Sequence, residues 1–270
     1  MGDDELYRQY ETVNVYRRGP GAKVELNRPE RLNAWSNQFS LDLKAAIGEV
    51  TDDPEIRAVT ITGAGRAFSS GADLKEVAER PGRTADDVYK RLTERYHPLI
   101  TGIRLMPKPV IAAVNGPAAG IGLSLALACD LVVAASSAFF QLAFVNIGLV
   151  PDGGSSLLVP SRVGFARAAE LAMLGERLDA RTALDWGLIN RVWPDDEFAA
   201  QADALLDRLA SGATQSYAGT KRQLNRWLYE QMDAQLEFEA GIQREMAASS
   251  DFAEGIAAFA AKRAPRFSGA

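Results

Sequence analysis

The sequence predicts an α/β fold whose last third is helical. Three runs of β-branched and small apolar residues, at residues 58–62, 109–114 and 130–135, each end in Gly, Asn or Ser and have the pattern of buried strands. Helical patterns begin just beyond the glycines that follow the first two runs. From residue 197 onward Ala, Leu, Gln, Arg and Glu dominate, and helical patterns follow one another to residue 263.

The N-terminal part adds a hairpin and a helix to this arrangement. Residues 12–16 and 22–26 are short apolar runs on either side of a Gly-Pro-Gly turn, which predicts two antiparallel strands. A helical pattern over about residues 36–50 follows, and a second amphipathic run covers residues 88–103. The Arg-Pro-Gly-Arg segment at residues 80–83 indicates a mobile loop between them.

The change in character near residue 197 suggests two regions. We expect a mixed α/β core over residues 1–196 and a helical region over residues 197–270. Apolar residues recur on one face of each helix between residues 238 and 259, and a peripheral face of this kind often needs a partner surface to cover it. The helical region is therefore expected to mediate oligomerisation.

The composition excludes several classes of protein. Of the 270 residues, 47% are apolar and 24% are charged, and the formal net charge is −5. This balance fits a globular chain, and without a basic block nucleic acid is not an expected partner. The weakly charged stretch at residues 109–151 is interrupted by Gly, Asn and Pro, which favours buried core over a membrane span. The acidic, polar N-terminus has no signal-peptide features, and the chain contains a single cysteine, Cys129. Both observations predict a cytoplasmic protein. The single histidine, His97, and the single cysteine also argue against a metal site.

Two turns carry the residues most suited to chemistry. The segment at residues 115–122 lacks the spacing of a dinucleotide fold or a P-loop, but it leads a strand into a helix N-terminus, whose free N–H groups can hold a developing negative charge. The glycines there can equally serve close packing. In the segment at residues 148–156, Asp152 stands at the start of a helix, where an N-cap role competes with a catalytic one.

Other candidate groups are more simply explained by structure. Ser124 lies in a sequence close to a hydrolase nucleophile elbow, but the final glycine of that motif is absent. His97 would have to act as its base, although its place in an amphipathic run favours a packing role. Cys129 lies among apolar residues just before a strand and is expected to be a small core residue.

Taken in order, several segments together resemble the crotonase superfamily, the enoyl-CoA hydratase/isomerase proteins. The resemblance covers nearly the whole chain, and it is carried by residues 26–34, 68–74, 114–120, 128–130, 148–154, 183–192 and 254–259. It implies a spiral of ββα turns that forms two stacked sheets, and C-terminal helices that build a homotrimer or a hexamer as a dimer of trimers. It also implies an acyl-CoA thioester as substrate, with coenzyme A as part of the substrate and no separate cofactor.

The resemblance assigns roles to individual residues. The backbone N–H groups of Ala72 and Ile121 correspond to the pair that holds the thioester oxygen. Isoleucine stands where family members carry glycine, and its side chain is expected to narrow the acyl channel. The residues expected to bind the coenzyme A part are Arg28, Arg31, Ser70, Asp73 and Leu74 from one subunit, and Phe259 and Lys262 from a neighbouring subunit.

The departures from the family pattern bear on the reaction. Ser124 and Phe144 occupy the positions of the two glutamates with which hydratases of the family add water, so hydration is expected to be impaired. Some isomerases of the family carry a single acid in the turn that here holds Asp152. We therefore expect an enoyl-CoA isomerase in which Asp152 moves a proton, within an apolar wall formed by Phe140 and Phe144. The alternatives are a hydratase or another crotonase reaction with a non-standard acid, such as Asp152 or Glu76, and a non-catalytic acyl-CoA-binding protein.

Overall fold

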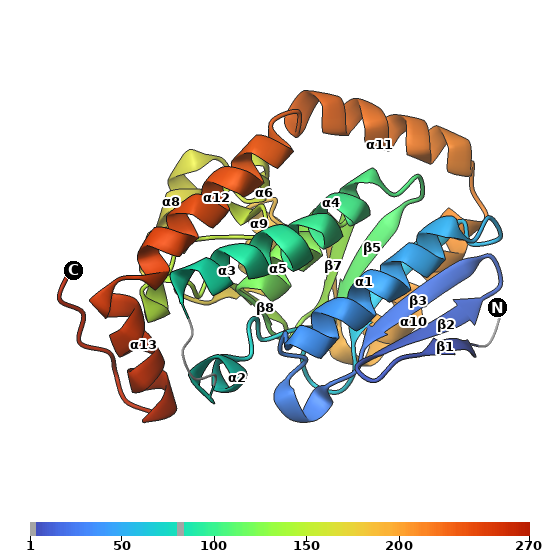
Figure 1. The fold of residues 1–270 in the computed structure, drawn as a ribbon. Coiled ribbons are helices and arrows are strands. Elements are labelled where there is room, and N and C mark those ends of the chain that lie inside the picture. Colours follow the sequence, from blue (N-terminus) through green and yellow to red (C-terminus); the bar gives the residue numbers. More distant parts are fainter. Residues whose placement is uncertain (1–3, 80–83) are drawn as a thin grey trace.

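A computed structural model describes residues 4–79 and 84–270, so the predicted loop at residues 80–83 lies outside the described residues. Two β-sheets organise the fold (Figure 1). The larger has seven strands in the order β1-β2-β3-β4-β5-β7-β10, and the smaller has three in the order β6-β8-β9. The strands are β1 (Glu5–Gln9), β2 (Val13–Arg18), β3 (Gly21–Leu26), β4 (Ala58–Gly63), β5 (Val110–Val114), β6 (Ala118–Ala119), β7 (Leu131–Ala135), β8 (Phe139–Gln141), β9 (Leu178–Asp179) and β10 (Arg191–Trp193).

The hairpin predicted near the N-terminus is β2 and β3, which pair antiparallel, and from β3 to β10 the strands of the larger sheet are parallel. The sequence does not predict β1, because all five of its residues are exposed and show no apolar alternation.

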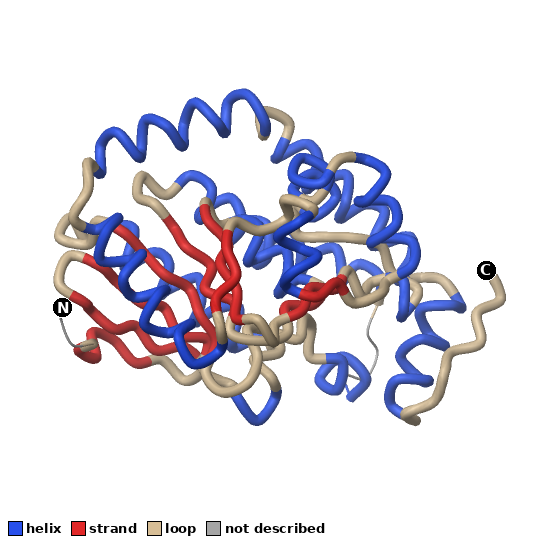
Figure 2. The backbone as a smooth tube through the Cα atoms, turned by 180° about the vertical axis from the view of Figure 1, so that it is seen from behind, coloured by secondary structure: helices blue, strands red, loops and turns tan. Residues whose placement is uncertain are grey.

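Helices cover both faces of the larger sheet, which explains why its central strands read as continuous apolar runs. In β5, Val110 and Ala112 pack into the main core, whereas Ile111 and Ala113 pack against helix α10. The helices are α1 (Asn37–Asp52), α2 (Leu74–Glu79), α3 (Ala85–Arg91), α4 (His97–Leu105), α5 (Ile121–Ala128), α6 (Ser155–Leu158), α7 (Pro160–Val163), α8 (Phe165–Leu174), α9 (Ala180–Asp185), α10 (Asp195–Ala210), α11 (Thr214–Leu228), α12 (Met232–Ala247) and α13 (Ser250–Ala260). Figure 2 shows the same layers from behind.

Three short helical segments complete the element list, namely the 3₁₀ turns η1 (Pro29–Arg31) and η3 (Val145–Ile147) and the π-helical segment η2 (Leu92–Tyr96). The amphipathic run predicted at residues 88–103 spans the end of α3, all of η2 and most of α4, so the expected helix is interrupted by one π-helical turn. π-helical turns often mark functional sites, and η2 contributes Leu92 and Tyr96 to the cavity described below.

The described residues after β10 form four helices, α10 to α13, joined by short connections. Helix α10 begins at Asp195, and its apolar face, with Phe198, Leu205 and Leu206, covers one face of the larger sheet. The division of the chain at residue 197 therefore does not separate this helix from the packing of the core. None of the helices in the described part of the chain has the length and apolarity that crossing a membrane requires.

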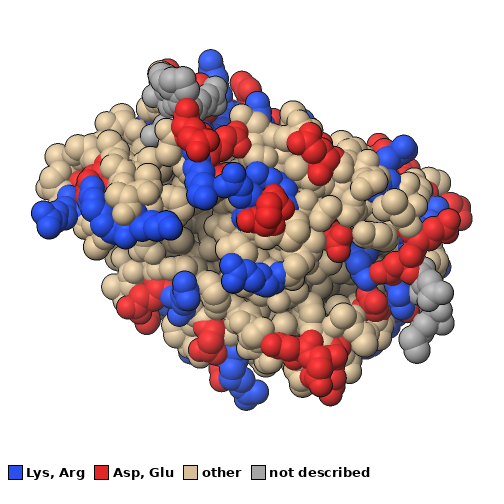
Figure 3. All heavy atoms as spheres, turned by 90° about the horizontal axis from the view of Figure 1, so that it is seen from below, with Lys and Arg blue, Asp and Glu red and all other residues tan. Residues whose placement is uncertain are grey.

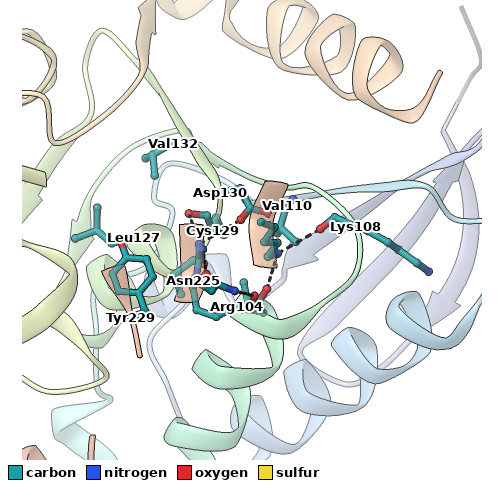
Figure 4. A network of polar contacts seen from close by, with 12 residues as sticks. Arg104, Lys108, Val110, Leu127, Cys129, Asp130, Val132, Asn225 and Tyr229 are labelled. Atoms are coloured by element: carbon teal, nitrogen blue, oxygen red, sulfur yellow. Dashed lines mark hydrogen bonds and ion pairs between the residues drawn. The ribbon is translucent and has the colours of Figure 1, made fainter. Parts of the chain in front are cut away.

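A buried polar network fastens helix α11 to the core (Figure 4). Arg104 at the end of α4 donates to the carbonyl of Ala128 at 3.1 Å, forms an ion pair with Asp130 at 3.2 Å, and donates to Asn225 of α11. Lys221 of α11 donates to the carbonyl oxygen of Ile103 at 2.8 Å and also pairs with Asp130 at 2.8 Å. These contacts hold α11 across the ends of α4 and α5, from where the chain returns as α12.

Candidate active site

A cavity of about 650 Å³ lies where α2, α3, η2, α5, β8, α12 and α13 meet. Most of its lining is apolar, and several charged side chains, among them Arg66, Arg91, Asp152 and Arg177, also reach it. The face seen from below in Figure 3 is hollowed near its centre, with Lys and Arg side chains on both sides of the hollow. Such a cavity suits a ligand with an apolar part and an anionic part.

Two neighbouring turns bring two backbone N–H groups to the wall of this cavity. The Gly71 turn brings the chain beside the Gly120 turn, and a Cβ added at Gly120 would lie only 3.8 Å from the Gly71 Cα. Both glycines have positive φ, +90° and +52°, which side chains rarely tolerate. The next residues, Ala72 and Ile121, line the cavity, and their N–H groups donate to no other group within the described chain. The two turns therefore form a pair of free donors suited to an oxyanion.

Asp152 also lines the cavity and is only 6% exposed. Its Oδ2 accepts a hydrogen bond from Nε2 of Gln243 at 2.8 Å, whereas its Oδ1 is buried and has no hydrogen-bond partner among the described residues. Burial raises the pKa of Asp152 from 3.8 to about 7, opposed by the Gln243 hydrogen bond and reinforced by the negative charge of Glu239. The side chain does not cap the helix that follows, so the N-cap explanation does not apply. A carboxyl group with this pKa can accept and release a proton near neutral pH.

Aromatic rings wall the cavity beside the donors. The ring of Phe144 lies 3.9 Å from a Cβ added at Gly120. Phe140 was expected on the same wall, but it is 1% exposed and is not among the residues that line the cavity, whereas its neighbour Phe139 is. The two side chains point to opposite faces of β8 because strand residues alternate, and the sequence does not tell which face meets the cavity.

The residues expected to bind the coenzyme A part are spread over two environments. Ser70 and Leu74 line the cavity. Arg28 and Asp73 do not line it, and they form an ion pair with each other at 3.1 Å. The side chain of Arg31 is exposed nearby.

Phe259 and Lys262 are placed differently from the expectation. Phe259 of α13 lines the cavity of its own chain, whereas the expectation placed it at the site of a neighbouring subunit. The reason is that α13 folds back against α2 and η3, where Phe252 and Ile256 pack with Val77. Lys262 is exposed beyond the end of α13 and is not part of the lining.

The remaining candidate nucleophiles and bases have structural roles. The hydroxyl of Ser124 is fully buried and donates to the Asp152 carbonyl oxygen at 2.8 Å, so it supports the turn. Burial lowers the pKa of His97 to about 4 and raises the pKa of the Cys129 thiol to about 12, which keeps both groups neutral near pH 7. Glu76 accepts from the Asn37 N–H at 3.3 Å and lies outside the cavity.

Several polar residues of the cavity are not predicted from the sequence, among them Arg66, Arg91, Arg177 and Gln243. The three arginines lie in segments without a recognisable motif. Gln243 contacts Asp152 across a separation of 91 residues, and nothing in its local helical pattern signals that contact.

Comparisons with known proteins agree with this geometry. The family model for "Enoyl-CoA hydratase/isomerase" matches residues 21–270. The chain is 42% identical over 246 residues to the 1,2-epoxyphenylacetyl-CoA isomerase of Escherichia coli, covering 91% of this chain and 94% of that protein. It is also 42% identical over 248 residues to a probable enoyl-CoA hydratase of Rhodobacter capsulatus, covering 92% and 94% of the two chains.

Solved structures extend the similarity to the fold. The crystal structure of an enoyl-CoA hydratase from Mycobacterium avium subsp. paratuberculosis matches with a TM-score of 0.87 and 40% identity, covering 96% of this chain and all of the other. The two sheets, the flanking helices and the C-terminal helices of the predicted fold are therefore those of the crotonase fold. The chain belongs to the enoyl-CoA hydratase/isomerase family.

Proposed function

We propose that this protein is an enoyl-CoA isomerase that moves a double bond along the acyl chain of a coenzyme A thioester, with Asp152 as its single acid and base. The observation that carries the proposal is the free, buried Oδ1 of Asp152 in a cavity that also presents two unpaired N–H groups. Asp152 is the one acidic residue among the described residues that line this cavity.

The proposed reaction needs no other reactant. Oδ1 of Asp152 takes a proton from C2 of a 3-enoyl thioester, and the electron pair moves onto the thioester oxygen to form a dienolate. The N–H groups of Ala72 and Ile121 hold this negative charge, and each such donor typically contributes on the order of 10²- to 10³-fold in rate. The protonated carboxyl group then returns the proton to C4, which gives the 2-enoyl product and restores the carboxylate. No separate cofactor takes part, since coenzyme A belongs to the substrate.

The surroundings of Asp152 favour a proton shift over the addition of water. Phe144 lines the cavity near the donors, and the buried hydroxyl of Ser124 is engaged with a carbonyl oxygen. Neither can activate a water molecule as a carboxylate can. Hydration nevertheless stands as the second candidate, because one relative of equal identity is described as a probable enoyl-CoA hydratase.

The purified protein is tested on matched 3-enoyl-CoA and 2-enoyl-CoA substrates by following the ultraviolet band of the conjugated thioester. We expect this band to appear from the 3-enoyl substrate, and we expect Asp152→Asn to lower the turnover by about 10²-fold or more. Binding of the acyl-CoA should survive in this variant, because the amide preserves the shape of the side chain. A matched control is Asp185→Asn, which changes an exposed aspartate of α9.

Three results would contradict the proposal in different ways. Loss of the band from the 2-enoyl substrate would identify a hydratase. Tight binding of the thioester without proton exchange from heavy water at C2 would identify a non-catalytic binding protein. Unchanged turnover in Asp152→Asn would remove Asp152 from the mechanism.

A further inference from the structure

Helix α12 presents three polar side chains to the turn that carries Asp152. Gln235, Glu239 and Gln243 are spaced four residues apart and therefore lie on one face of the helix. Gln235 donates to the hydroxyl oxygen of Ser156 at 2.7 Å. Glu239 accepts from the N–H of Gly154 at 2.7 Å and from that of Ser156 at 3.0 Å. One helix face thus holds the turn on the C-terminal side of Asp152.

Gln243 completes this face by contacting Asp152 itself. Its Oε1 accepts from the N–H of Val150 at 3.1 Å, and its Nε2 donates to Oδ2 of Asp152 at 2.8 Å. Because the backbone N–H of Val150 can only donate, it fixes which end of the amide faces Asp152. Gln243 is fully buried and lines the cavity, so its amide has no freedom to exchange these partners for solvent.

The Gln243 contact makes the two oxygens of Asp152 unequal. Oδ2 is occupied by a hydrogen-bond donor, whereas Oδ1 has no partner among the described residues. We propose that Gln243 is a positioning residue that holds Oδ2 of Asp152 and so reserves Oδ1 for proton transfer. The inference deepens the proposed function and rests on the role given there to Asp152.

The same contact bears on the charge of the carboxyl group. A donor on Oδ2 favours the carboxylate, and Arg91 of α3 acts in the same direction. Glu239 of α12 opposes ionisation, and the phenol of Tyr96 in η2 is the other titratable group in electrostatic contact with Asp152. Burial and the charge of Glu239 raise the pKa of Asp152, and the Gln243 hydrogen bond lowers it. Without that hydrogen bond, the carboxyl group should therefore release its proton at a higher pH.

Two substitutions of Gln243 distinguish the effect of its hydrogen-bond donor on Asp152 from the effect of its packing. Gln243→Met keeps the length of the side chain but removes both polar atoms. Gln243→Glu keeps an acceptor for the N–H of Val150 and, when ionised, removes the donor to Asp152. The matched control is Gln235→Met on the same helix face, because that amide contacts Ser156 and not the carboxyl group. Melting curves confirm that each variant is folded.

Two readouts are recorded for each variant as a function of pH. One is the infrared band of the protonated Asp152 carboxyl group, identified by subtraction of Asp152→Asn, and the other is kcat/KM with the 3-enoyl substrate. Both Gln243 variants should move the two midpoints upward by about one pH unit or more. Their kcat should fall about tenfold or more, with a smaller change in KM. Gln235→Met should leave both midpoints in place.

The outcomes distinguish this inference from the proposed function. Folded Gln243 variants that keep the parent midpoints and the parent kcat would overturn the positioning role, even if Asp152→Asn abolishes isomerisation. If the infrared midpoint moves but the parent protein does not isomerise the substrate, the contact of Gln243 with Asp152 stands and the proposed function is wrong. An equal shift in Gln235→Met would also overturn the inference, since it would assign the effect to the helix face as a whole.

Discussion

At the scale of single residues, the site depends on a carboxyl group that is buried and forms no ion pair with any residue in the described part of the chain. Among the described residues, the carboxyl group of Asp152 accepts one hydrogen bond, from Gln243, and the main effect of its surroundings is to penalise its charge. That penalty is a cost to stability and, in the proposed mechanism, the source of its basicity. The carboxylate is ready to take a proton because the fold stabilises it poorly.

The raised pKa of the buried Asp152 carboxyl group predicts how the stability of the protein depends on pH. Because the folded pKa of Asp152 is raised from 3.8 to about 7, the folded state keeps a proton that the unfolded state releases. The resulting stabilisation is complete below about pH 4 and is lost as the pH rises through about 7. Relative to Asp152→Asn, which does not titrate, the parent protein should therefore lose melting temperature between pH 5 and about pH 8. Scanning calorimetry of both proteins measures this difference, and a constant difference across that range would contradict it.

The residue scale also shows how far the sequence could predict the site. The resemblance to the crotonase superfamily predicts the roles of Ala72 and Ile121, each of which directly follows a glycine, and of Asp152, which directly precedes two glycines. The role of Gln243 could not be predicted, because a glutamine in a helix carries no sign of its partner until the chain has folded. The error at Phe140 has a similar cause, since three residues of strand do not reveal which face meets the cavity.

At the scale of elements, long apolar runs were predictable and short or exposed ones were not. The expected strands at residues 58–62, 109–114 and 130–135 are β4, β5 and β7, because burial on both faces leaves an unbroken apolar pattern. The strands β6 and β9 have two residues each, too few to show a period. Their positions follow from tertiary pairing with β8.

The buried polar contacts that attach helix α11 to the core should contribute measurably to the free energy of unfolding. Lys221 is 6% exposed, donates to a backbone carbonyl oxygen and pairs with Asp130. Lys221→Met keeps most of the buried stem but leaves that carbonyl oxygen unpaired and removes one of the two cations beside Asp130. We expect a loss of about 2 to 4 kcal/mol in the free energy of unfolding. Urea denaturation measures this loss. The control Lys44→Met, on the exposed face of α1, should change the free energy of unfolding by less than about 0.5 kcal/mol.

At the scale of the whole molecule, large apolar side chains remain exposed on the C-terminal helices. Trp227 of α11 is 81% exposed and Phe238 of α12 is 62% exposed. Leu224 lies one turn before Trp227 on the same helix and is also exposed. Side chains of this size rarely face water in such a group unless another surface covers them, which supports the proposal that this region joins copies of the chain.

The oligomeric state of the protein tests the role of these exposed side chains. If α11 and α12 contribute to contacts between copies, the parent protein should sediment as a trimer or a hexamer, and Trp227→Lys should shift it toward single chains, because a buried unpaired charge strongly opposes association. Leu41→Lys provides the control, since Leu41 is 52% exposed on α1, far from these helices in the sequence. Sedimentation velocity compares the three proteins. A parent protein that sediments as a single chain would contradict the oligomer, and an unchanged assembly in Trp227→Lys would place the interface elsewhere.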